Sequence, residues 1–287
     1  MLPCDEVTSV SPVRQAAVAG SWYPSSPDAL ARVVDAHLAA VGESPAGDPL
    51  AIISPHAGLA YSGPIAAHAY KLLRNRPIDF AVIVGPSHFV AFEGVAIYAR
   101  GAFATPLGPV PIAEEPAAAL QAASRQMKVL PEAHLREHSL EMQLPFLKRV
   151  LPEVAIVPLV MGRQRRETAY DLGDAIASVV AGSRAVIVAS TDLSHFQNAR
   201  IAAKLDNEVI QQVLRFDPDG LMSLLEEHPD HACGGGPTVS VMRAAQLLGA
   251  RDARVLKYGD SGDVSGDKDA VVGYLAAGFG TFARQVA

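Results

Sequence analysis

The sequence repeats one short pattern three times: an apolar run, a break, and then a histidine. The pattern is clearest at 81–88, AVIVGPSH, and recurs at 51–56 as AIISPH and at 185–195 as AVIVASTDLSH. Each run is short, rich in β-branched residues and followed by turn-forming residues, which is typical of a strand buried in a parallel sheet. Helical patterns separate the runs, so the chain is expected to fold in the α/β class.

The carboxyl ends of parallel strands share one edge of a sheet, where α/β proteins bind their ligands. We therefore expect the three strands to deliver His56, His88 and His195 to one common site. Between the strands, one helix is expected to begin at Pro64 and another to span 137–150.

No linker, repeat or low-complexity tract divides the sequence, so we expect a single domain over 1–287. Its central sheet should be mostly parallel and flanked by helices. Residues 1–25 are expected to form an irregular segment packed on the domain. The runs at 94–100 and 102–105 predict a strand pair, an antiparallel excursion near the sheet edge, because several prolines follow them.

Composition excludes several classes of function. The net charge of −6 and the absence of a Lys/Arg cluster argue against a nucleic-acid partner. No apolar stretch is long enough to span a membrane, and the N-terminus lacks the pattern of a secretory signal. Two cysteines, Cys4 and Cys233, are too few for a disulfide framework, so a cytoplasmic location is expected.

Cys233 precedes Gly-Gly-Gly-Pro, a sequence that predicts a helix start. The positive end of a helix favours a thiolate, which binds metals or attacks electrophiles. His56, His88 and Cys233 together form a candidate metal site for iron, copper or zinc. A small buried cysteine under a turn is the structural alternative.

Two further segments carry groups capable of chemistry. Asp192 precedes His195 by three residues, so it can orient the imidazole while His195 acts as a general acid or base. Alternatively, Asp192 caps the following turn. The segment 132–143, EAHLREHSLEMQ, contains the short inverted zinc-peptidase pattern His-x-x-Glu-His. We instead expect His138 and Glu141 to support the pocket, with a plain surface helix as the alternative. The Asp-rich segment 259–270 predicts a turn-rich connection between strands.

The sequence resembles the Memo family, whose bacterial and archaeal members occur beside radical-SAM and AMMECR-type proteins. Seven segments carry the resemblance in order along 17–279: AGSWYP, PHAGLAYSGPIAA, GPSHF, EHSLEMQLPFL, STDLSH, CGGGP and the late SGDVSGD with VVGYLAAGF. The resemblance implies a fold similar to class III extradiol dioxygenases, which use non-haem Fe(II). It also implies metal ligation by His56, His88 and Cys233, with Asp192 and His195 as the nearby acid and acid/base.

Two departures accompany the resemblance. Dioxygenases of this class have a carboxylate as the third metal ligand, where this chain has the Cys233 thiol. Gly236 stands where other Memo proteins can carry a histidine. The family has also been linked to copper.

Three hypotheses about function follow. The first is a metal-dependent, dioxygenase-like oxidoreductase with Fe(II), or alternatively Cu or Zn, acting on a small molecule. The second is a non-catalytic binding or scaffold protein that uses the pocket for peptides. The third is a hydrolase with Cys233 as nucleophile and His195 with Asp192 as base and orienter. Ligand-binding residues are expected at Tyr61, Ser87, His138 and Glu141. Radical-SAM and AMMECR-type proteins are expected partners by family association.

Overall fold

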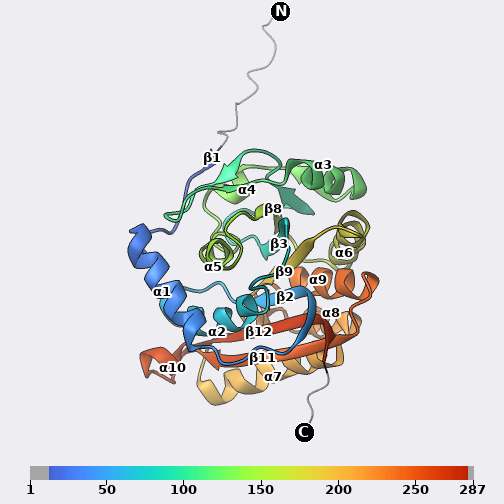
Figure 1. The fold of residues 1–287 in the computed structure, drawn as a ribbon. Helices are drawn as coiled ribbons and strands as arrows, with labels where there is room; N and C mark the ends of the chain where they lie inside the picture. Colours follow the sequence, from blue (N-terminus) through green and yellow to red (C-terminus); the bar gives the residue numbers. More distant parts are fainter. Residues whose placement is uncertain (1–12, 284–287) are drawn as a thin grey trace, which may run out of the picture.

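The computed structural model describes residues 13–283, so residues 1–12 of the predicted N-terminal segment lie outside it. Within that range, a nine-stranded mixed sheet forms the centre of the molecule, in the order β10-β12-β2-β9-β3-β8-β4-β7, with β11 paired to β12 (Figure 1). The strands are β2 (Gly47–Ser54), β3 (Phe80–Pro86), β4 (Val95–Ile97), β7 (Met127–Val129), β8 (Ala155–Met161), β9 (Ala185–Ser190), β10 (His195–Gln197), β11 (Asp252–Asp260) and β12 (Val271–Phe282).

Helices cover both faces of this sheet. They are α1 (Pro27–Ala40), α2 (Leu59–Lys71), α3 (Glu114–Ala123), α4 (Glu132–Leu135), α5 (Leu144–Val150), α6 (Arg166–Val180), α7 (Ala199–Arg215), α8 (Pro218–Glu227), α9 (Gly235–Leu247) and α10 (Gly262–Ser265). Figure 1 shows α1, α2 and α5 on one side and α6, α8 and α9 on the other. The α/β fold class is therefore confirmed.

The central strands are those that the sequence pattern identifies. β2, β9 and β3 are parallel neighbours, and β8 continues the parallel pairing beyond β3. Apart from the beginning of β2, their residues are almost all buried, as expected for strands with helices on both faces. The antiparallel strands lie outside this block, with β12 beside β2 and β4 beside β8.

The prediction that the runs at 94–100 and 102–105 form a strand pair with each other is wrong. β4 joins the main sheet, whereas β5 (Ala102–Phe103) pairs with β1 (Val13–Arg14) and β6 (Val110–Pro111) in a separate small sheet. Gly101 lies between the two strands with φ of 88°, a left-handed conformation that turns the chain away from β4.

Two predicted helix boundaries are also wrong. Helix α2 begins at Leu59, so Pro64 lies inside it. The hydrogen bond that Pro64 cannot donate would go to the carbonyl of Ala60, an exposed residue that solvent can reach. Residues 137–140 are not helical, and a 3-10 turn at Glu141–Gln143 leads into α5. The carbonyl of Glu137 accepts a hydrogen bond from the Arg14 side chain, which replaces the helical bond.

The N-terminal segment 13–25 is held on the domain by Glu141. This carboxylate is fully buried and forms an ion pair with Arg14, which is also buried. It accepts further hydrogen bonds from the backbone amides of Ala17 and Val18 and from the hydroxyl of Tyr23, at 2.7, 3.0 and 2.5 Å. Within residues 13–283, no helix combines the length and the apolar character needed to cross a bilayer.

Replacing Glu141 with Ala is expected to lower the free energy of unfolding by ~3–5 kcal/mol, because it leaves the buried Arg14 guanidinium without its counter-charge. Urea unfolding followed by circular dichroism measures the change. The control is Glu153→Ala, which removes an exposed carboxylate and should leave stability nearly unchanged. A loss below ~1 kcal/mol for Glu141→Ala would show that this carboxylate does not hold the segment in place.

Candidate metal centre

Three adjacent strands end at the same edge of the sheet and place polar residues there in register. β2 ends at Ser54, β3 at Pro86 and β9 at Ser190. The second residue after each strand is His56, His88 and Asp192, respectively. The parallel pairing of these strands therefore brings the three groups into one region, although they lie far apart in the sequence.

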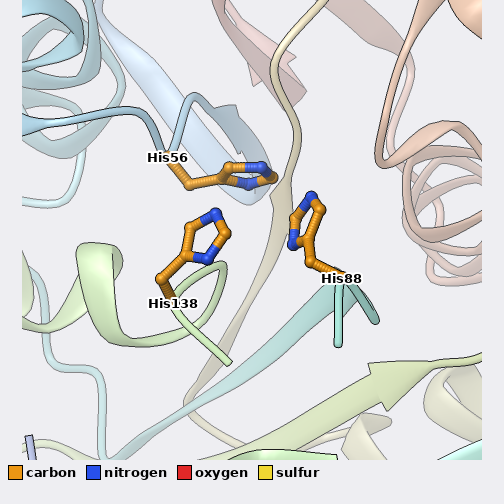
Figure 2. A group of neighbouring side chains, drawn as sticks. All are labelled: His56, His88 and His138. Carbon is orange, nitrogen blue, oxygen red and sulfur yellow. The ribbon is translucent and has the colours of Figure 1, made fainter. Parts of the chain in front are cut away.

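A third histidine joins His56 and His88 at this edge. His138 comes from the turn before α5, and one ring nitrogen from each histidine lies within 4.8 Å of the others. Figure 2 shows the three rings facing one another. The ring centroids of His88 and His138 are 4.4 Å apart, and that of His56 lies 5.3 and 5.6 Å from these two. The His56 and His138 rings are buried, and that of His88 is partly exposed.

Cys233 lies beside the Nε2 end of the His56 ring. Its Sγ is 3.2 Å from His56 Nε2 and accepts a hydrogen bond from the backbone amide of Asp192 at 3.3 Å. Among the described residues, His56, His88 and His138 form the group whose possible ligand atoms all lie within 4.8 Å of one another. In this group His138 is the third member, where the sequence predicted Cys233. Burial, and then the nearby Asp192 carboxylate, raise the pKa of the Cys233 thiol well above its ordinary value.

Glu137 fixes the position of His88. Its carboxylate accepts a hydrogen bond from the backbone amide of His88 at 2.6 Å and lies 2.9 Å from the ring nitrogen Nδ1. Burial alone would raise the pKa of Glu137, but the hydrogen bonds from His88 and Ser139 outweigh it and lower the pKa to about 2. As a carboxylate, Glu137 can only accept, so His88 Nδ1 carries the proton and Nε2 is free to bind a ligand.

The two buried histidines are held in their neutral form. Burial, with a smaller effect of His88, lowers the pKa of His56 to about 3. Burial, followed by the effects of His56 and His88, also lowers the pKa of His138 to about 3. Neutral imidazole is the form that binds metals. The Nδ1 atom of His138 is buried without a hydrogen-bond partner, which leaves a lone pair or a proton unsatisfied there.

Asp192 and His195 lie beside this cluster. Asp192 accepts a hydrogen bond from the His56 backbone amide at 2.7 Å, and burial raises its pKa to about 6 despite that bond. His195 is half-buried on β10, opposite Val272 of β12. A positive charge on His195 disfavours protonation of His56 and of Asp192, so the ring is close enough to interact with both.

The other predicted pocket residues have different surroundings. Tyr61 is exposed in the first turn of α2, and the hydroxyl of Ser87 donates to the carbonyl of Val90. Glu141 is fully buried and binds the N-terminal segment, which brings Trp22 to 4.3 Å from the His138 ring. His134 points elsewhere, with its buried ring against Tyr98 and Phe103. The two histidines of the His-x-x-Glu-His pattern, His134 and His138, therefore do not face the same site.

Sequence reasoning did not identify Glu137 as the partner of His88, nor Ser190 and Gln143 as neighbours of His56. Ser190 Oγ lies 2.9 Å from His56 Nδ1, and Gln143 donates to Ser190. The short motif at 134–138 was the available signal for Glu137. In the Asp-rich segment, the Lys268 ammonium binds Asp260 and Asp263, as expected of a connection held by its own side chains.

Comparison with known proteins agrees with the resemblance seen in the sequence. Residues 14–278 match the family model described as Memo-like protein. A MEMO1 family protein of Methanothermobacter thermautotrophicus is 38% identical over 272 residues, which cover 91% of this chain and 98% of the relative. Another from Thermotoga petrophila is 36% identical, covering 92% and 98%. An uncharacterized protein of Escherichia coli K12 shares the fold with a TM-score of 0.50 and 15% identity, covering 79% of this chain and 99% of its own.

Cys233 is expected to react slowly with iodoacetamide in the folded, metal-free protein at neutral pH. The raised pKa keeps the sulfur protonated, and each pKa unit lowers the thiolate fraction about tenfold. Peptide mass spectrometry compares the labelling rate with that of the same cysteine in urea. Equal rates in the folded and unfolded states would contradict the raised pKa and would favour an activated, nucleophilic cysteine.

Proposed function

This chain belongs to the Memo family, and from that premise we propose that it binds one transition-metal ion at the histidine cluster and serves a redox reaction on a small molecule. The observation that carries the proposal is the convergence of three imidazole side chains from remote parts of the chain.

His56 and His88 are the ligands on which the geometry and the resemblance agree. His138 supplies a third imidazole, and Cys233 supplies a sulfur beside His56 Nε2. Nitrogen and sulfur donors of this kind suit iron, copper and zinc. We propose iron, in line with the dioxygenase-like resemblance, and metal analysis distinguishes it from the other two.

In the proposed function, Asp192 and His195 would move protons. A bound iron ion would supply a Lewis acid and a one-electron redox couple. We propose that His195, which interacts electrostatically with Asp192, accepts a proton from a bound hydroxyl group and returns it. Asp192, anchored by the His56 backbone amide, connects this acid/base pair to the ligand cluster. The residues are therefore suited to oxidation of a small molecule that loses a proton on binding.

A second candidate function is binding without turnover. The exposed aromatic side chains in the described residues are Trp22, Tyr61, Phe89 and Phe196. Trp22 and Phe89 contact the His138 ring, and Phe196 contacts His195. Exposed aromatic side chains of this kind are typical of the surface around a binding site for a peptide or another aromatic ligand. A hydrolase with Cys233 as nucleophile is less well supported, because burial keeps that thiol protonated.

Replacing His88 with Ala is expected to abolish iron binding without unfolding the protein, because the ring is partly exposed and Glu137 keeps its hydrogen bonds from the backbone amides of residue 88 and Ser139. Elemental analysis of anaerobically purified protein measures the iron content, and circular dichroism checks the fold. His228→Ala, at an exposed histidine on the loop after α8, is the matched control. Stoichiometric iron in the His88→Ala protein would contradict the proposed centre.

The contribution of Glu137 can be tested separately from that of the ligands. Glu137→Gln removes the carboxylate that orients His88, and loss of such a partner lowers metal affinity by ~10–100-fold. Co(II) titration read by the fluorescence of Trp22, the only tryptophan of the chain, measures the affinity. Glu132→Gln changes an exposed carboxylate nearby and should have no effect. Equal affinity for both variants would show that Glu137 does not support a metal ligand.

A further inference from the structure

A chain of buried hydrogen bonds leads from the protein core to the His56 ring. We propose that Ser190 and Gln143 are positioning residues, which hold His56 in the tautomer with its proton on Nδ1 and thereby leave Nε2 free as a metal donor. The inference rests on the proposed metal centre for its consequence. The tautomer itself can be measured in the metal-free protein.

The first step is the orientation of the Gln143 side-chain amide. Gln143 is fully buried, and its two ends face different partners. The carbonyl of Pro55 lies 3.0 Å from one end, and because a carbonyl can only accept, that end must be the amide nitrogen Nε2. The hydroxyl of Tyr70 donates to the other end, Oε1, at 2.8 Å. The nitrogen therefore also donates to Ser190 Oγ, at 2.7 Å.

The second step is the single proton of the Ser190 hydroxyl. The carbonyl of Ser139 lies 2.6 Å from Ser190 Oγ and can only accept, so it takes this proton. Ser190 Oγ then offers only lone pairs to its other neighbours. One neighbour is the Gln143 amide nitrogen, and the other is His56 Nδ1, at 2.9 Å. A hydrogen bond forms between Ser190 and His56 only when Nδ1 carries the proton.

The third step concerns what the other tautomer would cost. With the proton on Nε2, the lone pair of Nδ1 would face a lone pair of Ser190 Oγ, and the buried contact would have no donor. Ser190, Gln143 and Tyr70 are each fully buried, so water does not replace the lost bond. Tyr70 is itself stacked on Phe146, with ring centroids 5.2 Å apart, which fixes the far end of the chain in the core.

The tautomer determines which nitrogen of His56 faces the site. With Nδ1 protonated, Nε2 has a free lone pair and lies 3.2 Å from Cys233 Sγ. His88 is held in the same tautomer by the Glu137 carboxylate. Both rings therefore present Nε2 as the metal donor, but for different reasons. The Nδ1 proton of His88 is bound by a carboxylate, whereas that of His56 is bound by a hydroxyl whose own proton goes to the Ser139 carbonyl.

Nitrogen-15 NMR of the histidine rings in the metal-free protein tests the assignment directly. The wild-type spectrum is expected to show His56 with a protonated Nδ1 and an unprotonated Nε2. In Ser190→Ala, the hydroxyl acceptor is lost while the Ser190 backbone carbonyl stays in place, and the population with Nε2 protonated should rise. Gln143→Met should show a smaller rise, because it removes the amide that donates to Ser190 Oγ but leaves the hydroxyl in place. Ser240→Ala, which removes an equally buried hydroxyl bound only to the Gly236 carbonyl, should leave His56 unchanged.

Co(II) affinity should follow the same order, with a loss of ~10–100-fold in Ser190→Ala. A wild-type His56 protonated on Nε2 would overturn the inference, as would a Ser190→Ala protein with unchanged tautomer and affinity. A wild-type protein with the expected tautomer that binds neither Co(II) nor Fe(II) would instead support the assignment and refute the metal centre. The tautomer assignment and the metal centre can therefore fail independently of each other.

Discussion

The candidate site depends on the parallel pairing of three strands. β2, β9 and β3 are neighbours in register, so the loops that follow them leave the sheet side by side. Because these strands are buried on both faces, a shift in register would disrupt the core as well as the loops. The register of the central strands therefore fixes where the backbone of His56, His88 and Asp192 leaves the sheet, which a metal or catalytic site of defined geometry requires.

Burial at this edge has two consequences that act together. It lowers the pKa of His56 and His138, which keeps both rings neutral at physiological pH. It also excludes water, so each ring nitrogen must find a protein partner or a ligand. His56 and His88 have partners for Nδ1 in Ser190 and Glu137, whereas Nδ1 of His138 has none. A carboxylate partner strengthens an imidazole as a metal ligand more than a hydroxyl does, so the two rings would differ in donor strength.

The sequence predicted those parts of the site that local patterns determine. A β-branched run followed by a turn identifies a strand and the residues after it, which is why His56, His88 and Asp192 could be found. His138 and Glu137 could not be placed in the same way. Their turn depends on Arg14, which is over a hundred residues distant and binds the carbonyl that a helix would otherwise use. Ser190 and Gln143 look like ordinary strand and helix residues until the tertiary structure brings them to His56.

The N-terminal segment connects the stability of the fold to the site. Glu141 accepts the hydrogen bonds that hold residues 14–23 on the domain, and it lies three residues after His138. The same segment presents Trp22 to the His138 ring, and the Trp22 carbonyl accepts the first amide of α2. Arg14 in turn binds both Glu141 and the carbonyl of Glu137, the residue that orients His88. One buried ion pair therefore fixes the turn that carries His138, the carboxylate partner of His88, and the segment that presents Trp22 to the His138 ring.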